Sequence, residues 1–465
     1  MKNIVIESLV NSQKVAVLED GKLSELFIEN GSSKIVSNIY RGVVKKALKG
    51  MEAFFVDIGS EKLAYLSMNK NENIKCGQDI LVQVNKEAVG TKGPKLNTEV
   101  SFAGRYLVYI PSNDRLTISN KITLEKERFR LKKIVQRIDK DFTGIIRTEA
   151  IGCSDEELEK DILELKIKYK NVLKEYKLGI GPKLLYKDLD FASKYLKDNV
   201  NDSVSKVIVN NEFKYNELKD ILINIEKNYK DKLILENNKD VFDLYSVQKQ
   251  IDNYLDKKIW LKSGGYLIVD KTEALTVIDV NTGKFTGNLN LEETVYKTNL
   301  EAAMEISKLL KIRDIAGIII VDFIDMQKEK YKKSLLEVLT KEVSKDKRKT
   351  NVMGMTKLGL VEIARRREKE SIESYYLNKC FICKNGYNVK SINRFLDEIE
   401  KGVMRVKEHT SYSEIDIEVN ASIFEEISKH HNNIIKKIAE KYSIKINLRK
   451  NEKIDYEKMN IIFNS

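Results

Sequence analysis

Two stretches decide the fold of this chain: Ala274-Leu-Thr-Val-Ile-Asp-Val-Asn281 and Ile315-Ala-Gly-Ile-Ile-Ile-Val-Asp-Phe-Ile-Asp325. Each has the apolar, β-branched composition of a core strand, and residues 291–311 between them have the pattern of a helix. A strand–helix–strand unit makes its two strands parallel, with both carboxyl ends at one edge of the sheet. The unbroken apolar run before Asp322 further predicts a strand that is buried on both faces.

Polar side chains end both of these strands. Asp279 and Asn281 lie two residues apart, so on a strand both point to one face. Ligands of open α/β sheets bind at the carboxyl edge, where we expect Asp322 to join them. Oxygen ligands suit Mg²⁺ or Mn²⁺, and Mg²⁺ held by carboxylates commonly meets phosphate substrates. An aspartate at a strand end is also common as a loop or cap residue, so either one alone indicates little.

The composition favours a polyanionic partner. Lys and Arg number 82 against 70 Asp and Glu, a net charge of +12 over 465 residues, and this length predicts several domains. No apolar run approaches the roughly 20 residues of a membrane span, and residues 1–7 lack the apolar region of a signal peptide. We therefore expect a cytoplasmic protein. The three histidines lie far from the acids in the sequence, which argues against a His-ligated zinc hydrolase.

Short strands separated by Gly and Asn fill residues 39–102. Five of them in so little chain predict a small barrel of the OB type, with strands at 40–47, 53–58, 63–67, 80–85 and 96–102. Such barrels bind single strands with exposed aromatic side chains and a basic rim. The candidates for stacking are Phe54, Phe55 and Tyr65, bordered by Lys86 and Lys92. Since adjacent residues on a strand face opposite ways, we expect one of the two phenylalanines in the core.

The remaining segments alternate between strands and helices. Near the N-terminus we expect two short strands, Ile4–Ile6 and Lys14–Leu18, in a sheet completed by later residues. Further along, the patterns predict helices at 158–176, 212–228, 241–258 and 327–345, strands at 203–210 and 351–356, a basic helix through Arg365–Arg367, and a small α/β unit at 393–465.

Residues 143–149 have the pattern of a short strand, which includes Arg147 and Thr148. A guanidinium fork and a hydroxyl donor suit a phosphate group. Taken alone, these two residues are more typical of an ordinary protein surface than of a phosphate site.

Cys380 and Cys383 form a CxxC sequence followed by Gly386. Zinc takes four ligands, and no second CxxC is present. Cys76 and Cys153 lie in regions that we assign to other domains. The pair is therefore either half of an intermolecular zinc site or two structural or redox thiols.

Together these motifs resemble the RNase E/G family of bacterial endoribonucleases, and most closely its short members. The resemblance covers essentially the whole chain in the family's order. It rests on Ile39-Tyr-Arg-Gly42, Ala53-Phe-Phe-Val-Asp-Ile-Gly59, Ile145-Ile-Arg-Thr148, Gly179-Ile-Gly-Pro182 with Leu185-Tyr186, Thr272–Lys284 and Gly317–Met326. The last two segments resemble the catalytic blocks of the family and are highly specific.

The resemblance implies a multidomain α/β fold. The implied segments are an RNase H-like domain at 1–34 and 190–257, an S1-type OB barrel at 35–118, a 5′-sensor region at 119–189, a DNase I-like catalytic domain at 258–378, a zinc-link at 379–392 and a small α/β dimerisation or RNA-contact domain at 393–465.

The resemblance also implies roles for individual residues. Asp279 and Asp322 would coordinate a catalytic Mg²⁺, with Asn281 hydrogen-bonding near the scissile phosphate. Cys380 and Cys383 would contribute two thiolates to a Zn²⁺ shared with a second chain, which implies a homodimer or a larger assembly.

Further implied roles concern RNA. The 5′-monophosphate would be held by Arg147 and Thr148, and bases would stack on Phe55 and Tyr65, with Lys92 beside them. Two departures from the family pattern concern these functions. Phe381 replaces the proline usual after the first cysteine, and Val89 replaces a basic residue usual before the glycine loop.

The activity implied is a Mg²⁺-dependent hydrolysis of single-stranded RNA to 5′-phosphate and 3′-hydroxyl ends, with a preference for 5′-monophosphorylated substrates, in rRNA and tRNA processing and mRNA decay. An alternative is a non-catalytic RNA-binding protein that uses only the barrel and the basic surface. A nuclease acting on DNA is disfavoured only by the resemblance. We expect no membrane partner.

Overall fold

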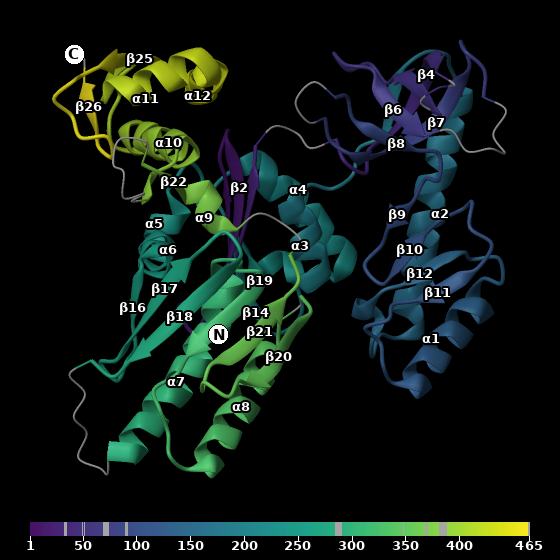
Figure 1. Cartoon of the computed structure of the whole chain (residues 1–465). Coiled ribbons are helices and arrows are strands. Elements are labelled where there is room, and N and C mark those ends of the chain that lie inside the picture. The colour runs from purple at the N-terminus through teal and green to yellow at the C-terminus, as the bar shows by residue number, and fades with distance from the viewer. Residues whose placement is uncertain are drawn as a thin grey trace. The chain divides into compact units, whose positions relative to one another are not determined.

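The computed structural model describes residues 1–31, 35–48, 50, 52–67, 74–88, 92–283, 291–346, 348–367, 371–380 and 388–463. It divides into two compact units (Figure 1). The first unit joins residues 1–32 to residues 200–465, and the second comprises residues 33–199. Among the described residues, no helix combines the length and the apolarity needed to cross a bilayer. The finer division into six segments stays a prediction.

The two stretches that decide the fold are neighbouring strands of a sheet in the first unit, here called the acid-bearing sheet. Its described strands run in the order β16 (Lys258–Trp260), β17 (Tyr266–Lys271), β18 (Leu275–Asn281), β19 (Gly317–Asp322), β21 (Val361–Arg365) and β20 (Thr350–Met355). As predicted, β18 and β19 are parallel, and the helix α7 (Leu291–Ile312) connects them. The other pairings in this sheet are antiparallel.

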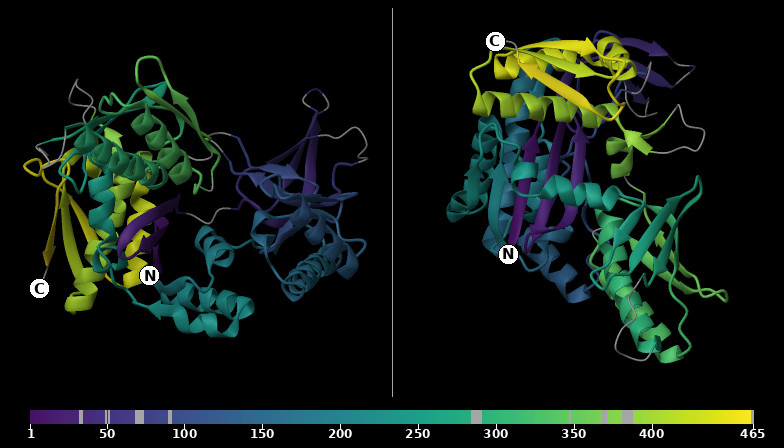
Figure 2. Two further views of the ribbon diagram at one scale, coloured as in Figure 1. Left: turned by 90° about the horizontal axis from the view of Figure 1, so that it is seen from below. Right: turned by 90° about the vertical axis from the view of Figure 1, so that its left-hand side faces the viewer.

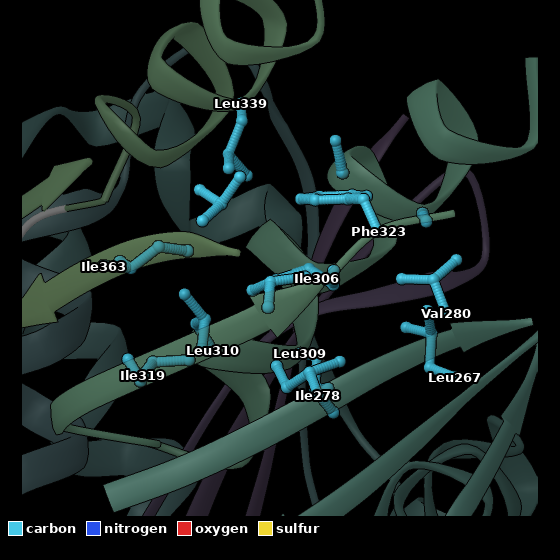
Figure 3. Packing of buried hydrophobic residues seen from close by; sticks show 14 of the residues in the cluster. Leu267, Ile278, Val280, Ile306, Leu309, Leu310, Ile319, Phe323, Leu339 and Ile363 are labelled. Carbon is cyan, nitrogen blue, oxygen red and sulfur yellow. The ribbon is translucent and has the colours of Figure 1, made fainter. Parts of the chain in front are cut away.

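One face of the acid-bearing sheet is covered by α7 and by α8 (Glu329–Val343). Figure 3 shows side chains of β17 and β18, such as Leu267 and Ile278, in one cluster with side chains of α7, such as Ile306 and Leu309. Alternate residues of each strand enter this core. The side chains between them therefore point to the opposite, open face.

Two expectations for this region are wrong. The strand β19 is not buried on both faces, because Ile318 is 56% exposed and Asp322 is exposed. Its apolar run resembles that of a central strand covered by helices on both sides, whereas α7 and α8 pack on the same side. The segment ending at Arg365 is a strand rather than a basic helix, since burial alternates with period two from Val361 to Arg365.

The N-terminal residues form a second sheet in the first unit. Its order is β15 (Leu233–Leu235), β14 (Val204–Val209), β1 (Lys2–Ser8), β2 (Ser12–Glu19) and β3 (Lys22–Asn30). The expected completion by later residues is confirmed, because β1 pairs in parallel with β14. The third strand β3 was not predicted. The expected helix at 241–258 is interrupted, giving α5 (Val241–Leu244), α6 (Val247–Leu255) and then β16.

A small α/β layer ends the chain. It contains β24 (Glu414–Val419), β25 (Lys445–Lys450) and β26 (Met459–Phe463) with the helices α10 (Ile392–His409), α11 (Ala421–Glu426) and α12 (Asn432–Tyr442). Figure 2 shows this layer beside the N-terminal strands in both views. The two termini of the sequence therefore belong to the same unit.

A buried ion network, made of Glu7, Lys14, Asp397 and Lys401, joins the N-terminal strands to α10. The Lys14 ammonium lies 2.7 Å from Asp397 and 3.1 Å from Glu7, and Lys401 lies 2.8 Å from the other Glu7 oxygen. Burial raises the pKa of Glu7, but the charges of Lys401 and Lys14 outweigh it and hold the pKa below its ordinary value. The network fixes two distant parts of the sequence in one arrangement.

The second unit contains the expected barrel. Five described strands close on themselves, β4 (Ile39–Leu48), β5 (Ala53–Asp57), β6 (Ala64–Ser67), β8 (Lys95–Asn97) and β7 (Asp79–Lys86), with closure between β4 and β7. The strand β13 (Lys183–Tyr186) extends β4 on its other side. This closed five-stranded arrangement is consistent with an OB-type domain.

The rest of the second unit packs around another core. A small sheet with the order β11 (Leu116–Ile118), β12 (Gly144–Ile146), β10 (Leu107–Tyr109) and β9 (Phe102–Ala103) packs with α1 (Glu125–Ile138) and α2 (Asp155–Lys177). Ser154 begins α2 with a capping box to Glu157. The short strand predicted at 143–149 is β12, which ends earlier, at Ile146, so Arg147 and Thr148 lie after it rather than in it. The helix α3 (Phe191–Asn199) ends this unit.

Candidate functional site

The predicted acids meet on the open face of the acid-bearing sheet. Asp279 on β18 pairs directly with Asp322 on the parallel strand β19. Paired residues on adjacent strands point to the same side, about 4.8 Å apart along the hydrogen-bonding direction. Because Ile278 and Val280 enter the core, the carboxylate between them faces away from α7. We call Asp279 and Asp322 the acid pair.

Asn281 completes this group, as the sequence predicted. Its side-chain Nδ2 donates a hydrogen bond of 2.7 Å to Oδ2 of Asp279. The amide thereby fixes the orientation of that carboxylate through Oδ2. Gly265 lies against the backbone of Asn281, where an added Cβ would meet its carbonyl oxygen at 2.7 Å.

A buried asparagine that the sequence reasoning missed holds the loop after β19. The fully buried side chain of Asn299, on α7, donates to the backbone oxygen of Ile324 at 2.8 Å and accepts from its backbone N–H at 3.1 Å. This loop begins immediately after Asp322, so Asn299 is a positioning residue for it. The available signal was an amide in the apolar stripe of α7, between Val295 and Ala302.

The acid pair fits a hard divalent cation. Among the described residues, no group of three or more His, Cys, Asp or Glu side chains could hold a metal. Two carboxylates suffice for Mg²⁺, which keeps several waters and completes its shell with substrate phosphate. The exposure of Asp322 leaves room for such a substrate.

On the barrel, the expected aromatic pair is present on the outer surface. Phe55 on β5 pairs with Tyr65 on β6, and the rings lie 6.3 Å apart at 83°. Phe54 is in the barrel core, which confirms that one of the two phenylalanines is buried. The strand register sets a lysine on each side of the aromatic pair, with Lys46 opposite Phe55 and Lys95 opposite Tyr65.

These residues belong to one cross-strand row, here called the barrel row, consisting of Lys46, Phe55, Tyr65, Lys95 and Lys86. The predicted Lys86 pairs with Lys95. Sequence reasoning missed Lys46 and Lys95, because only the pairing of β4 with β5 and of β6 with β8 brings them beside the rings. Lys92 is exposed three residues before Lys95, whereas Val89 lies outside the described residues.

The predicted phosphate-binding pair lies in the second unit. The Arg147 guanidinium forms a bidentate ion pair with Asp198 at 2.9 and 2.7 Å, and it donates to the backbone oxygen of Gly104 at 2.6 Å. The Thr148 hydroxyl lies 3.0 Å from that of Ser119. Both side chains therefore already have protein partners, and an anion would share or replace the contact with Asp198.

The cysteines are only partly described. Cys380 is half-buried after β22 (Leu377–Lys379), whereas Cys383 and Phe381 lie outside the described residues. Burial raises the pKa of the Cys153 thiol to about 11. The zinc-link stays a prediction.

Comparison with known proteins adds an independent result. The model of the Ribonuclease E/G family matches residues 101–368. Ribonuclease G of Haemophilus influenzae is 39% identical over 420 residues, which cover 85% of this chain and 86% of that protein. Ribonuclease G of Escherichia coli strain K12 is 37% identical, covering 87% and 88%. Ribonuclease E of a Nostoc species is 34% identical, covering 82% of this chain and 58% of that protein.

Proposed function

We propose that this chain, which belongs to the Ribonuclease E/G family, is an endoribonuclease. In this proposal it cuts single-stranded RNA with Mg²⁺ at the acid pair. The observation that carries this proposal is the direct pairing of Asp279 with Asp322 on an open sheet face. Two carboxylates on adjacent parallel strands, one oriented by an amide, form a site for one hard cation and a phosphate.

Each residue of the site has a defined part in this hydrolysis. Asp279 and Asp322 would hold the metal, and Asn281 keeps the Asp279 carboxylate in one orientation through its hydrogen bond. A bound Mg²⁺ supplies polarisation of a phosphoryl oxygen and a water of lowered pKa. Asn299 keeps the backbone after Asp322 in place. Water attack on the phosphodiester leaves 5′-phosphate and 3′-hydroxyl ends.

The barrel row is the proposed binding surface for unpaired RNA. Two aromatic rings between lysines suit a single strand, since bases stack on the rings while ammonium groups contact the backbone. Stacking needs unpaired bases, so duplex RNA is excluded. Arg147 and Thr148 are proposed to hold a 5′-monophosphate, which tethers the strand and raises its effective concentration at the acid pair.

The assembly and the biological role belong to the same proposal. Cys380 and Cys383 would bind one Zn²⁺ together with the same cysteines of a second copy, because two thiolates are half of the four ligands that zinc takes. A homodimer or a larger assembly follows. The substrates proposed are precursors of rRNA and tRNA, and mRNA.

The decisive experiment is cleavage of a short, internally labelled, 5′-monophosphorylated RNA. Wild type is compared with Asp279→Asn, in Mg²⁺ and after EDTA. We expect internal cuts only by wild type with metal. Asp270→Asn is the matched control. Asp270 lies on β17, on the same face of the sheet as Asp279, but it pairs with Val277 and is not part of the acid pair. Tight binding without cutting, in Mg²⁺ and in Mn²⁺, would overturn the proposal and favour the RNA-binding alternative.

A further inference from the structure

Beside the acid pair, the open face of the acid-bearing sheet carries two aromatic residues with no assigned role. Trp260 on β16 pairs with Tyr266 on β17, and Tyr266 pairs with Asn281 on β18. The three side chains therefore form one row across neighbouring strands. Their strand neighbours Ile259 and Leu267 are buried in the core, which directs this row to the open face.

The rings form a compact pair, here called the aromatic platform. Trp260 and Tyr266 have ring centroids 5.4 Å apart at 64°. The Lys258 ammonium lies 4.0 Å from the Trp260 ring centre and 3.7 Å from that of Tyr266. Lys258 occupies the adjacent cross-strand row, which continues through Ile268 to Asp279. The basic and aromatic side chains are thus in register with the acid pair.

Core packing does not account for this arrangement. Trp260 is the single tryptophan of the sequence, and it is 62% exposed on an edge strand. A large aromatic ring left in water beside a cation is typical of a binding surface rather than of a core. The side chain of Lys258 is also exposed, so its ammonium can leave the rings for a phosphate without a large desolvation cost.

We propose that the aromatic platform stacks one unpaired base of the RNA strand within about three nucleotides of the scissile phosphate, while Lys258 contacts the backbone of that nucleotide. This inference rests on the proposed function and adds a binding subsite to the acid pair. Trp260 lies two strand spacings, about 10 Å, from Asn281. About three stacked nucleotides, or fewer in an extended strand, span that distance.

The chemistry predicts a position-specific but base-tolerant contact. Every base has a π-face, and the described platform presents rings and an ammonium, so purine and pyrimidine are both accepted. Removing the base at this position should weaken RNA binding more than replacing it with another base. Loss of one stacking contact is expected to weaken binding by roughly 5- to 100-fold.

The first arm of the test measures stacking without catalysis. Asp279→Asn protein is titrated with a short, 5′-monophosphorylated single-stranded RNA, and the fluorescence of Trp260 is followed. Because no other tryptophan is present, saturable quenching reports on this ring alone. An RNA with one abasic residue, moved stepwise along the strand, is expected to abolish the quenching at one position only. Unchanged fluorescence at saturating RNA would overturn the platform.

The second arm measures cleavage by protein in which Asp279 is unchanged. Trp260→Ala is expected to lower kcat/KM by 5- to 100-fold and to lose sensitivity to the abasic residue at that same position, whereas Trp260→Phe retains most of both. Phe213→Ala is the matched control, since Phe213 is 79% exposed on α4 (Glu212–Ile225) of the same unit. Equal cleavage by wild type and Trp260→Ala would reject the platform but leave the nuclease intact. Absence of cleavage by wild type would reject the proposed function instead.

Discussion

The barrel row and the open face of the acid-bearing sheet are built alike but differ in charge. In both, cross-strand pairing sets two aromatic rings side by side with a lysine next to them. The barrel row is flanked by lysines on each side. The open face instead has the acid pair two and three strands from its outer ring, Trp260.

This difference indicates how the same cross-strand row of two aromatic rings and a lysine suits two different kinds of binding. Lysines beside aromatic rings attract and hold a polyanion, whereas paired carboxylates repel it until a cation is bound. The barrel row is therefore suited to binding alone, and the acid pair to holding a phosphate only when a cation is bound. Five predictions test this contrast, beginning with the largest expected effect.

The strongest test removes the charge of one acid. Asp322→Asn should lower cleavage on the order of 10³-fold, because metal stabilisation of transition-state charge amounts to several kcal/mol, while RNA binding by the barrel row persists. Single-turnover cleavage and fluorescence polarisation measure the two properties. Glu362→Gln, on the open face of the neighbouring strand and paired with Ile320, should cleave normally. Equal loss of binding and cleavage in Asp322→Asn would contradict the contrast.

A change in the buried ion network should destabilise the first unit without altering either surface. Lys14→Met leaves Glu7 and Asp397 short of one cation in a buried site, so we expect a loss of about 3–5 kcal/mol in the free energy of unfolding. Denaturant titration measures it. Lys429→Met removes an exposed ion pair with Glu425 in the same unit and should cost at most about 1 kcal/mol. Similar costs for both variants would show that the network is not buried in solution.

A change in the barrel row should weaken binding more than chemistry. Tyr65→Ala removes one stacking ring, worth about 1–3 kcal/mol, so the Kd for single-stranded RNA should rise while the rate at saturating RNA stays near that of wild type. Phe129→Ala, which removes a 71% exposed ring from α1 of the same unit, is the control. A fall in the saturated rate with unchanged Kd would assign Tyr65 to the chemistry instead.

Arg147→Ala tests the proposed 5′-phosphate site. The ratio of cleavage of monophosphorylated over hydroxyl-ended RNA should fall about tenfold, because a charge-assisted hydrogen bond is lost. Arg147 also joins Gly104 to Asp198, so the melting temperature should fall as well. The ratio separates the two effects, since destabilisation lowers cleavage of both substrates equally. An unchanged ratio would remove the sensor role.

The smallest effect concerns single charges of the barrel row. Lys95→Gln should reduce the slope of log affinity against log salt by about 0.7, the value for one phosphate contact on a single strand. Lys140→Gln, an exposed lysine elsewhere in the second unit, should leave the slope unchanged. Equal slopes for Lys95→Gln and wild type would place the RNA backbone away from this lysine.

Much of the fold followed from local patterns. The strand–helix–strand unit, the small barrel and the burial of one of the two residues Phe54 and Phe55 depend on residue spacing that recurs wherever such elements form. The errors arose where one pattern fits two structures. The apolar run before Asp322 is the same for a strand covered on one face or on both, and the arginines at 365–367 concealed the period-two burial of β21.

The sequence by itself determined which residues are proposed to carry the chemistry. Asp279, Asn281 and Asp322 end two strands that a helix connects, and strand periodicity puts the first two on one face. Only the tertiary structure decided what stands beside them. Lys95 meets Tyr65, Asn299 meets Ile324, and Trp260 joins the row of Asn281 through strand pairing or helix packing. Such contacts depend on register between segments far apart in the chain, and register is set by the packed core rather than by local spacing.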